Sequence, residues 1–125
     1  MSDHARLSIA HWVTRVIAAG ILVMGALPKL TGGASELADR LPGGGSVVTA
    51  IAIVEILAIV LMFVPRTTRV GSGIATVVMI GAVASHVAGP VGMEGDFATM
   101  FVLALVAALS AGAATVIAGR RQTAS

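Results

Sequence analysis

The sequence predicts an all-α integral membrane protein, a four-helix bundle that runs up-down-up-down with both termini in the cytoplasm. The first observation is composition: 57% of the residues are hydrophobic and 11% are charged, whereas a soluble domain carries about 25% charged residues. The second is that four apolar stretches are long enough to cross a bilayer, which takes about 20 residues each. The third is that turn residues fill the breaks between them. The length fits one transmembrane domain over residues 1–125.

Each predicted span ends at residues that break or turn a helix. The first resembles a signal peptide in its short uncharged core, but we expect a membrane helix in which Arg15 and Lys29 are the polar exceptions. The outer loop 31–45 contains a segment, 35–41, that is either a short amphipathic helix on the bilayer surface or an irregular polar loop. The short connection 65–69 makes the second and third spans an antiparallel hairpin. The predicted spans are residues 8–30, 46–64, 70–88 and 97–118.

The distribution of charge predicts the orientation. In a four-span chain, the two termini and the second connection share one side of the membrane. That side holds most of the arginines, and the other side holds most of the acids beyond residue 30. An excess of Lys and Arg marks the cytoplasmic side. The arginines on the predicted cytoplasmic side are Arg6, Arg66, Arg69, Arg120 and Arg121.

Several classes of function are disfavoured. The chain has no cysteine, which removes disulfides, thiol redox chemistry and iron–sulfur clusters. The net charge of +2 includes no dense basic run, so we expect no nucleic-acid partner. No metal motif is present, and His11 and His86 should lie near opposite membrane faces, too far apart to hold one haem. The sequence therefore predicts no metal site and shows no evident cofactor motif.

Glu55 is the most unusual residue, because every neighbour within five positions is apolar. It should lie near the middle of the bilayer, and Arg15 should lie at nearly the same depth, about 10 Å inside the membrane. An isolated charge at that depth costs about 2.5–3.5 kcal/mol or more. We therefore expect an Arg15–Glu55 ion pair. It is either a catalytic site for proton exchange or a structural pair that fixes the helix register.

Lys29 and His86 should lie at similar depth, near the outer ends of their helices. With Glu94 and Asp96 just beyond, they form a candidate ligand-binding vestibule on the outer side. The alternatives are that Lys29 extends its ammonium to the outer interface and that His86 is a packing residue. Stripes of small residues in the second, third and fourth spans favour close helix packing.

The motifs also carry a family resemblance. They are WVTRVIAAGILVMGALPKLTG, LADRLP, VEILAIVLMFVPRTTRVG and VVMIGAVASH, which contain Trp12, Arg15, Gly25, Lys29, Glu55 and His86. In their order and spacing the chain resembles the DoxX-like family of small four-helix membrane proteins of bacteria. The resemblance covers nearly the whole chain. It implies the bacterial inner membrane and a place in a membrane oxidoreductase complex, with a bound quinone as the implied cofactor.

Three functional hypotheses stay open, and the sequence does not decide whether the protein is an enzyme. The first is a subunit of a quinone-linked membrane oxidoreductase, in which Glu55 exchanges protons with a quinol. The second is a non-enzymatic binding or assembly subunit that docks partner subunits within the bilayer. The third is a carrier of small solutes or protons, which requires a homo-oligomer because four short helices leave only a narrow passage.

Overall fold

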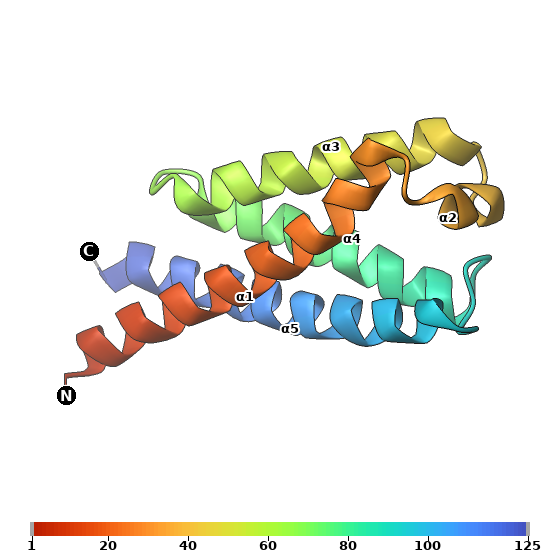
Figure 1. Cartoon of the computed structure of the whole chain (residues 1–125). Helices are drawn as coiled ribbons and strands as arrows, with labels where there is room; N and C mark the ends of the chain where they lie inside the picture. The colour runs from red at the N-terminus through yellow and green to blue at the C-terminus, as the bar shows by residue number, and fades with distance from the viewer. Residues whose placement is uncertain (1, 125) are drawn as a thin grey trace.

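The computed structural model describes residues 2–124, and it describes their side chains as far as Arg120. These residues form helices joined by turns (Figure 1). The helices are α1 (Asp3–Thr31), α2 (Ser35–Arg40), α3 (Gly44–Phe63), α4 (Thr68–Val87) and α5 (Asp96–Ala124).

Four of the helices, α1, α3, α4 and α5, are long and apolar enough to cross a membrane. Their outward faces are apolar as well: the side chains of Val77 and Leu109 are 70% and 69% exposed. Such exposure is unfavourable in water and ordinary where lipid covers the surface. The expectation of an all-helical protein with four apolar helices suited to a multi-pass membrane protein is confirmed.

The four long helices pack in a ring. Helix α1 contacts α3 and α5, and α4 contacts the same two helices, while α1 and α4 hardly touch. Figure 1 shows both chain ends and the α3–α4 turn at one end of the molecule, here named the terminal end. The opposite end, here named the α2 end, holds α2 and the α4–α5 connection.

The bundle core is built from small residues. Buried alanines from α1, α3, α4 and α5 meet there with Leu22, Met62 and Met79. Helices α3 and α4 are in close contact at Gly71, where an added Cβ would lie 2.6 Å from the carbonyl carbon of Leu61 and 2.8 Å from the carbonyl oxygen of Ala58. No larger side chain fits there without moving a helix, so the α3–α4 contact depends on this glycine.

The α2 end has a small core of its own. Leu37, Val48, Val91 and Phe97 are buried together. Arg40 ties α2 to the α4–α5 connection: its Nη1 donates a hydrogen bond of 2.6 Å to the carbonyl oxygen of Val91. Its guanidinium lies 4.4 Å from the centre of the Phe97 ring. The segment left open between a short helix and an irregular loop is therefore helical over Ser35–Arg40, and it is held by both apolar and polar contacts.

Two helices extend well beyond the predicted spans. Helix α1 begins at Asp3, five residues before the predicted start, because the side chain of Ser2 caps it by accepting a hydrogen bond from the backbone of Ala5 at 3.1 Å. Helix α5 continues beyond 118 to Ala124. Hydropathy marks the apolar part of a helix, whereas capping and local propensity decide where it ends.

Candidate functional site

Glu55 forms its ion pair with Lys29. Both side chains lie inside the bundle, with 1% of the Glu55 side chain and 11% of the Lys29 side chain exposed. Nζ of Lys29 donates a hydrogen bond to Oε1 of Glu55. A buried charge without a partner is costly, so each of these groups stabilises the charged form of the other.

The direction of helical side chains explains this pairing. Side chains on a helix lean towards its N-terminus. Lys29 lies near the C-terminus of α1, at the α2 end, and its long chain reaches back one turn, so that Nζ comes within 3.8 Å of a Cβ placed on Gly25. Helix α3 begins at the α2 end, so Glu55 leans towards Lys29. The two side chains therefore approach each other from opposite directions.

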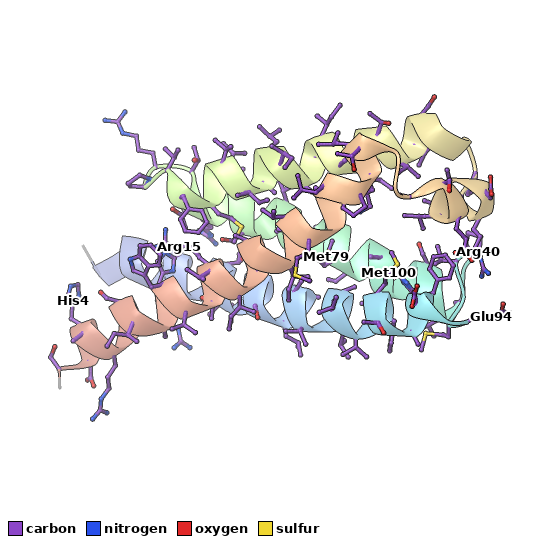
Figure 2. The ribbon with its side chains drawn as sticks, viewed as in Figure 1. His4, Arg15, Arg40, Met79, Glu94 and Met100 are labelled. Carbon is purple, nitrogen blue, oxygen red and sulfur yellow. The ribbon has the colours of Figure 1, made fainter. Side chains whose placement is uncertain are left out.

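The predicted Arg15–Glu55 pair is wrong. Arg15 instead donates from Nη1 to the carbonyl oxygen of Met62 at 3.2 Å, and its guanidinium lies 5.4 Å from the Trp12 ring centre and 5.2 Å from that of Phe63. Met62 is seven residues beyond Glu55 on α3, which is about 10 Å along the helix. Figure 2 shows Arg15 on the half of the molecule nearer the chain ends.

The predicted pair assumed that two charges at the same depth meet. Counting residues from the predicted helix ends placed Arg15 and Glu55 at nearly the same depth, but in the structure the guanidinium of Arg15 lies at the carbonyl of Met62, next to the last residue of α3. The side chain of Arg15 also leans towards the N-terminus of α1, away from Glu55. Position and direction therefore both separate the two residues.

One oxygen of Glu55 is not used by the pair. Oε2 is buried and has no hydrogen-bond partner among the described residues. It lies next to Gly25, where an added Cβ would be 3.4 Å away. Because Gly25 has no side chain, space is left beside this oxygen. A buried carboxylate oxygen without a donor is unusual in proteins and calls for an explanation such as a bound ligand or water.

His86 presents a second unsatisfied acceptor. The ring is 5% exposed, and Nδ1 lies 2.7 Å from the carbonyl oxygen of Ala82. Because a carbonyl oxygen accepts hydrogen bonds, Nδ1 carries the hydrogen, and in the neutral ring Nε2 is then an acceptor. Within the described part of the chain, Nε2 has no hydrogen-bond partner. The ring centre lies 6.4 Å from that of Phe97 and 6.0 Å from that of Phe101.

A cavity of about 340 Å³ joins these groups. Its polar lining includes Lys29, Glu55 and His86, and most of the remaining wall is apolar, with Met79, Phe97 and Met100 among its residues. Figure 2 shows Met79 and Met100 between the ends marked by Arg15 and Arg40. An apolar cavity with a few convergent polar groups is the usual form of a small-molecule site.

The sequence-predicted site residues thus divide into two groups. Lys29, Glu55 and His86 meet at one cavity, and Asp96 lies on its lining. Arg15 lies apart, at the Met62 carbonyl. Glu94 is not on the lining and lies 3.6 Å from Arg40. The alternative in which Lys29 extends to the interface does not hold, since its ammonium points into the bundle.

Sequence reasoning missed two features of the site. Gly25 belongs to one of the sequence motifs, but the motif does not show its role in the site, which is to leave space beside Oε2 of Glu55. Arg40 lies in the predicted outer loop 31–45 and is not among the predicted site residues, although it fastens the segment that covers the cavity. The helical spacing of Gly25 and Lys29, one turn apart, was the available signal for the first.

Comparison with family models, with curated proteins and with solved structures finds no match to this chain. The resemblance to the DoxX-like family therefore rests on the sequence motifs and stays a prediction.

Proposed function

We propose that this protein is a membrane subunit that binds a quinone or quinol, as part of a quinone-linked oxidoreductase complex. One observation carries the proposal: two buried acceptor atoms without a described donor, Oε2 of Glu55 and Nε2 of His86, belong to side chains that line one apolar cavity. A buried acceptor left without a donor costs about 1–3 kcal/mol. The cavity is therefore suited to a ligand that brings donors to an apolar environment.

A quinol fits this set of groups. Its flat, apolar ring suits a wall that includes Met79, Phe97 and Met100, and its two hydroxyls supply donors for Glu55 and His86. In the oxidised form the hydroxyls become carbonyls, which need a hydrogen-bond donor. The ammonium of Lys29, which lies beside Glu55, would donate to one of them. The same three side chains can therefore bind both redox forms.

The chemistry divides between the ligand and the chain. A bound quinone would carry two electrons and two protons per cycle, with the electrons exchanged with a partner subunit that holds a redox centre. Glu55 would hold or release a proton at Oε2, and His86 would do the same at Nε2. Lys29 keeps Glu55 oriented and balances its charge when the proton leaves. The apolar walls exclude water from the site.

We also propose the orientation and location that the sequence indicates. The chain would cross the bacterial inner membrane up-down-up-down, with the terminal end in the cytoplasm, because that end carries Arg66 and Arg69 on the α3–α4 turn and the start of α4. The cavity would then open in the outer half of the bilayer. The resemblance to DoxX-like proteins supports both assignments.

The test uses a variant that keeps every polar group. Gly25→Ala places a methyl 3.4 Å from Oε2, an ordinary contact distance, so we expect it to fold. The methyl occupies the space that a donor to Oε2 needs. Losing a hydrogen bond to a charged group costs about 1.5–3 kcal/mol, so binding should weaken about tenfold or more. The matched control is Gly20→Ala on the same helix, where no described atom outside its own helix lies within 4 Å of the added Cβ.

The readout is the quinone bound per protein. Wild-type protein is purified in mild detergent, its lipids are extracted, and occupancy with an added decyl-chain benzoquinone or its quinol is measured by native mass spectrometry. We expect near-stoichiometric binding in the wild type and in Gly20→Ala, and loss of quinol binding in Gly25→Ala. Absence of binding in the wild type, or equal binding in all three proteins, would contradict the proposal.

A second candidate is an assembly subunit without a ligand, in which the Lys29–Glu55 pair serves to fix the helix register. The observation that favours it is that each charge of the pair already has its counter-charge. Under this proposal a partner subunit, and no quinone, would co-purify in a fixed ratio. The same native mass spectra separate the two candidates.

A further inference from the structure

The exposed part of the lining indicates where the cavity opens. The buried lining residues come from α2, α3, α4 and α5 and include Glu55, Met79 and Phe97, whereas α1 contributes none of them. The exposed lining comes from α1, from the segment after it and from the start of α5, and includes Met24, which is 61% exposed. Figure 1 shows the second half of α1 diverging from α5 and crossing towards α3. The exposed lining therefore indicates an opening on the side of the bundle at Met24, between α1 and α5, which continues to the α2 end at Glu36 and Asp96.

The residues that border the mouth are apolar inside the bilayer and polar at the α2 end. Met24 is seven residues before the end of α1, and Leu103 is seven residues after the start of α5, so each lies about 10 Å along its own helix from the helix terminus nearer the α2 end. At that depth, a membrane-spanning bundle faces hydrocarbon. Glu36 and Asp96, which also line the cavity, lie at the α2 end itself.

The volume limits what can be enclosed. A cavity of 340 Å³ is at the low end of the range of about 300–1,000 Å³ for sites of drug-sized ligands. It has room for a ring-sized head group and no room for a long hydrocarbon chain in addition. Any chain on the ligand must leave through the mouth.

We propose that the ligand is a long-chain quinol that enters sideways from the bilayer, with its ring at Glu55 and its chain leaving between Met24 and Leu103 into lipid. This inference rests on the proposed function and adds the class of ligand and the route. The ring reaches the polar groups of the cavity. The chain lies in hydrocarbon both before and after the ring enters, so it loses no apolar contact. Met24 and Leu103 are the positions that decide whether a chain is accepted.

The experiment narrows the mouth without touching the polar groups. Met24→Trp and Leu103→Trp each place a large ring at the mouth. Their matched controls are Val23→Trp and Val102→Trp, which change the neighbouring residues, 37% and 55% exposed and absent from the lining. The probes are a benzoquinol with a ten-carbon chain and the same benzoquinol without the chain. Occupancy is measured by native mass spectrometry after reconstitution into nanodiscs at a fixed ratio of probe to lipid.

We expect Met24→Trp and Leu103→Trp to reduce occupancy by the chain-bearing quinol about tenfold or more, the scale on which a pocket discriminates by steric fit. The chain-free quinol should bind these variants within about twofold of the wild type, and both controls should bind both probes normally. The lateral route is overturned if the two mouth variants leave chain-bearing occupancy unchanged, or if they reduce both probes equally. It is also overturned if phospholipid alone fills the site. If the wild type binds neither probe, the proposed function itself fails.

Discussion

Helix α1 carries two cations on one face, and they serve different purposes. Arg15, near the terminal end, donates to the Met62 carbonyl and lies over the rings of Trp12 and Phe63. Lys29, near the α2 end, pairs with Glu55 beside a cavity. The first anchors α1 to the end of α3. The second holds a buried carboxylate that still has one oxygen available.

These two residues show that the direction of a side chain matters as much as its depth in deciding which buried charges pair. In an antiparallel helix pair, side chains lean towards opposite ends of the bundle. A charged side chain therefore meets a partner that lies further along the bundle, in the direction in which that side chain leans. It does not meet a partner at the same level. Lys29 and Glu55 lean towards each other, whereas Arg15 leans away from Glu55. The same rule applies to other membrane helix pairs.

The largest expected effect is the loss of Lys29. Lys29→Met removes the counter-charge of a carboxylate that is 1% exposed, and breaking a buried pair in this way typically costs about 3–5 kcal/mol. We expect a large drop in the free energy of unfolding, measured by reversible denaturation in mixed micelles. Lys29→Arg, which keeps the charge, should lose less. If Lys29→Met were as stable as the wild type, Lys29 would not be the counter-charge that stabilises Glu55.

A smaller effect is expected at Arg40, which binds a backbone carbonyl as Arg15 does but at the α2 end. Arg40→Met removes a charge-assisted hydrogen bond, worth about 1.5–3 kcal/mol, and the contact with Phe97. Hydrogen exchange should show faster opening of the α2 amides and little change in α5. Arg66→Met, on the exposed α3–α4 turn, is the control. Equal protection of α2 in Arg40→Met and Arg66→Met would show that Arg40 does not hold this segment.

The smallest effect is expected at Arg15. Arg15→Met removes a hydrogen bond of 3.2 Å to the Met62 carbonyl, which is longer than the 2.6 Å bond of Arg40. It also removes cation–π contacts, which contribute about 0.5–1 kcal/mol each at a partly exposed site. Arg15→Met keeps the apolar part of the side chain, so we expect a loss of unfolding free energy well below that of Lys29→Met in the same micelles. Binding of the decyl-chain quinol should be unchanged, since Arg15 is not on the cavity lining. A loss as large as that in Lys29→Met would contradict the smaller contribution to stability that we assign to Arg15.

Much of the fold could be predicted from the sequence, because lipid imposes a simple rule. A membrane helix needs a long apolar run, and the four runs in this chain are interrupted by glycine, proline and charge. The sequence does not distinguish a helix at Ser35–Arg40 from an irregular loop, because a short polar segment has no strong period. Its stability comes from Leu37 in the small core and from Arg40 across the loop, which are contacts distant in sequence.

The sequence shows which charged and polar residues belong to the site, and it does not show which of them meet. Glu55 was evident because a charge in an apolar run is costly, and Lys29 and His86 were evident for the same reason. Which of them meet depends on the relative height of two helices, and an error of a few residues in a helix start shifts that height by several ångström. The cavity itself depends on a missing side chain at Gly25 and on the divergence of α1 from α5. Neither is visible in a hydropathy pattern.

The most direct test of the account is a pair of double-mutant cycles on Glu55. One cycle combines Lys29→Met with Glu55→Leu, and the other combines Arg15→Met with Glu55→Leu, with unfolding free energy measured in the same mixed micelles. We expect a coupling of about 2–3 kcal/mol between Lys29 and Glu55 and about 0.5 kcal/mol or less between Arg15 and Glu55. Strong coupling of Glu55 to Arg15, with none to Lys29, would contradict it.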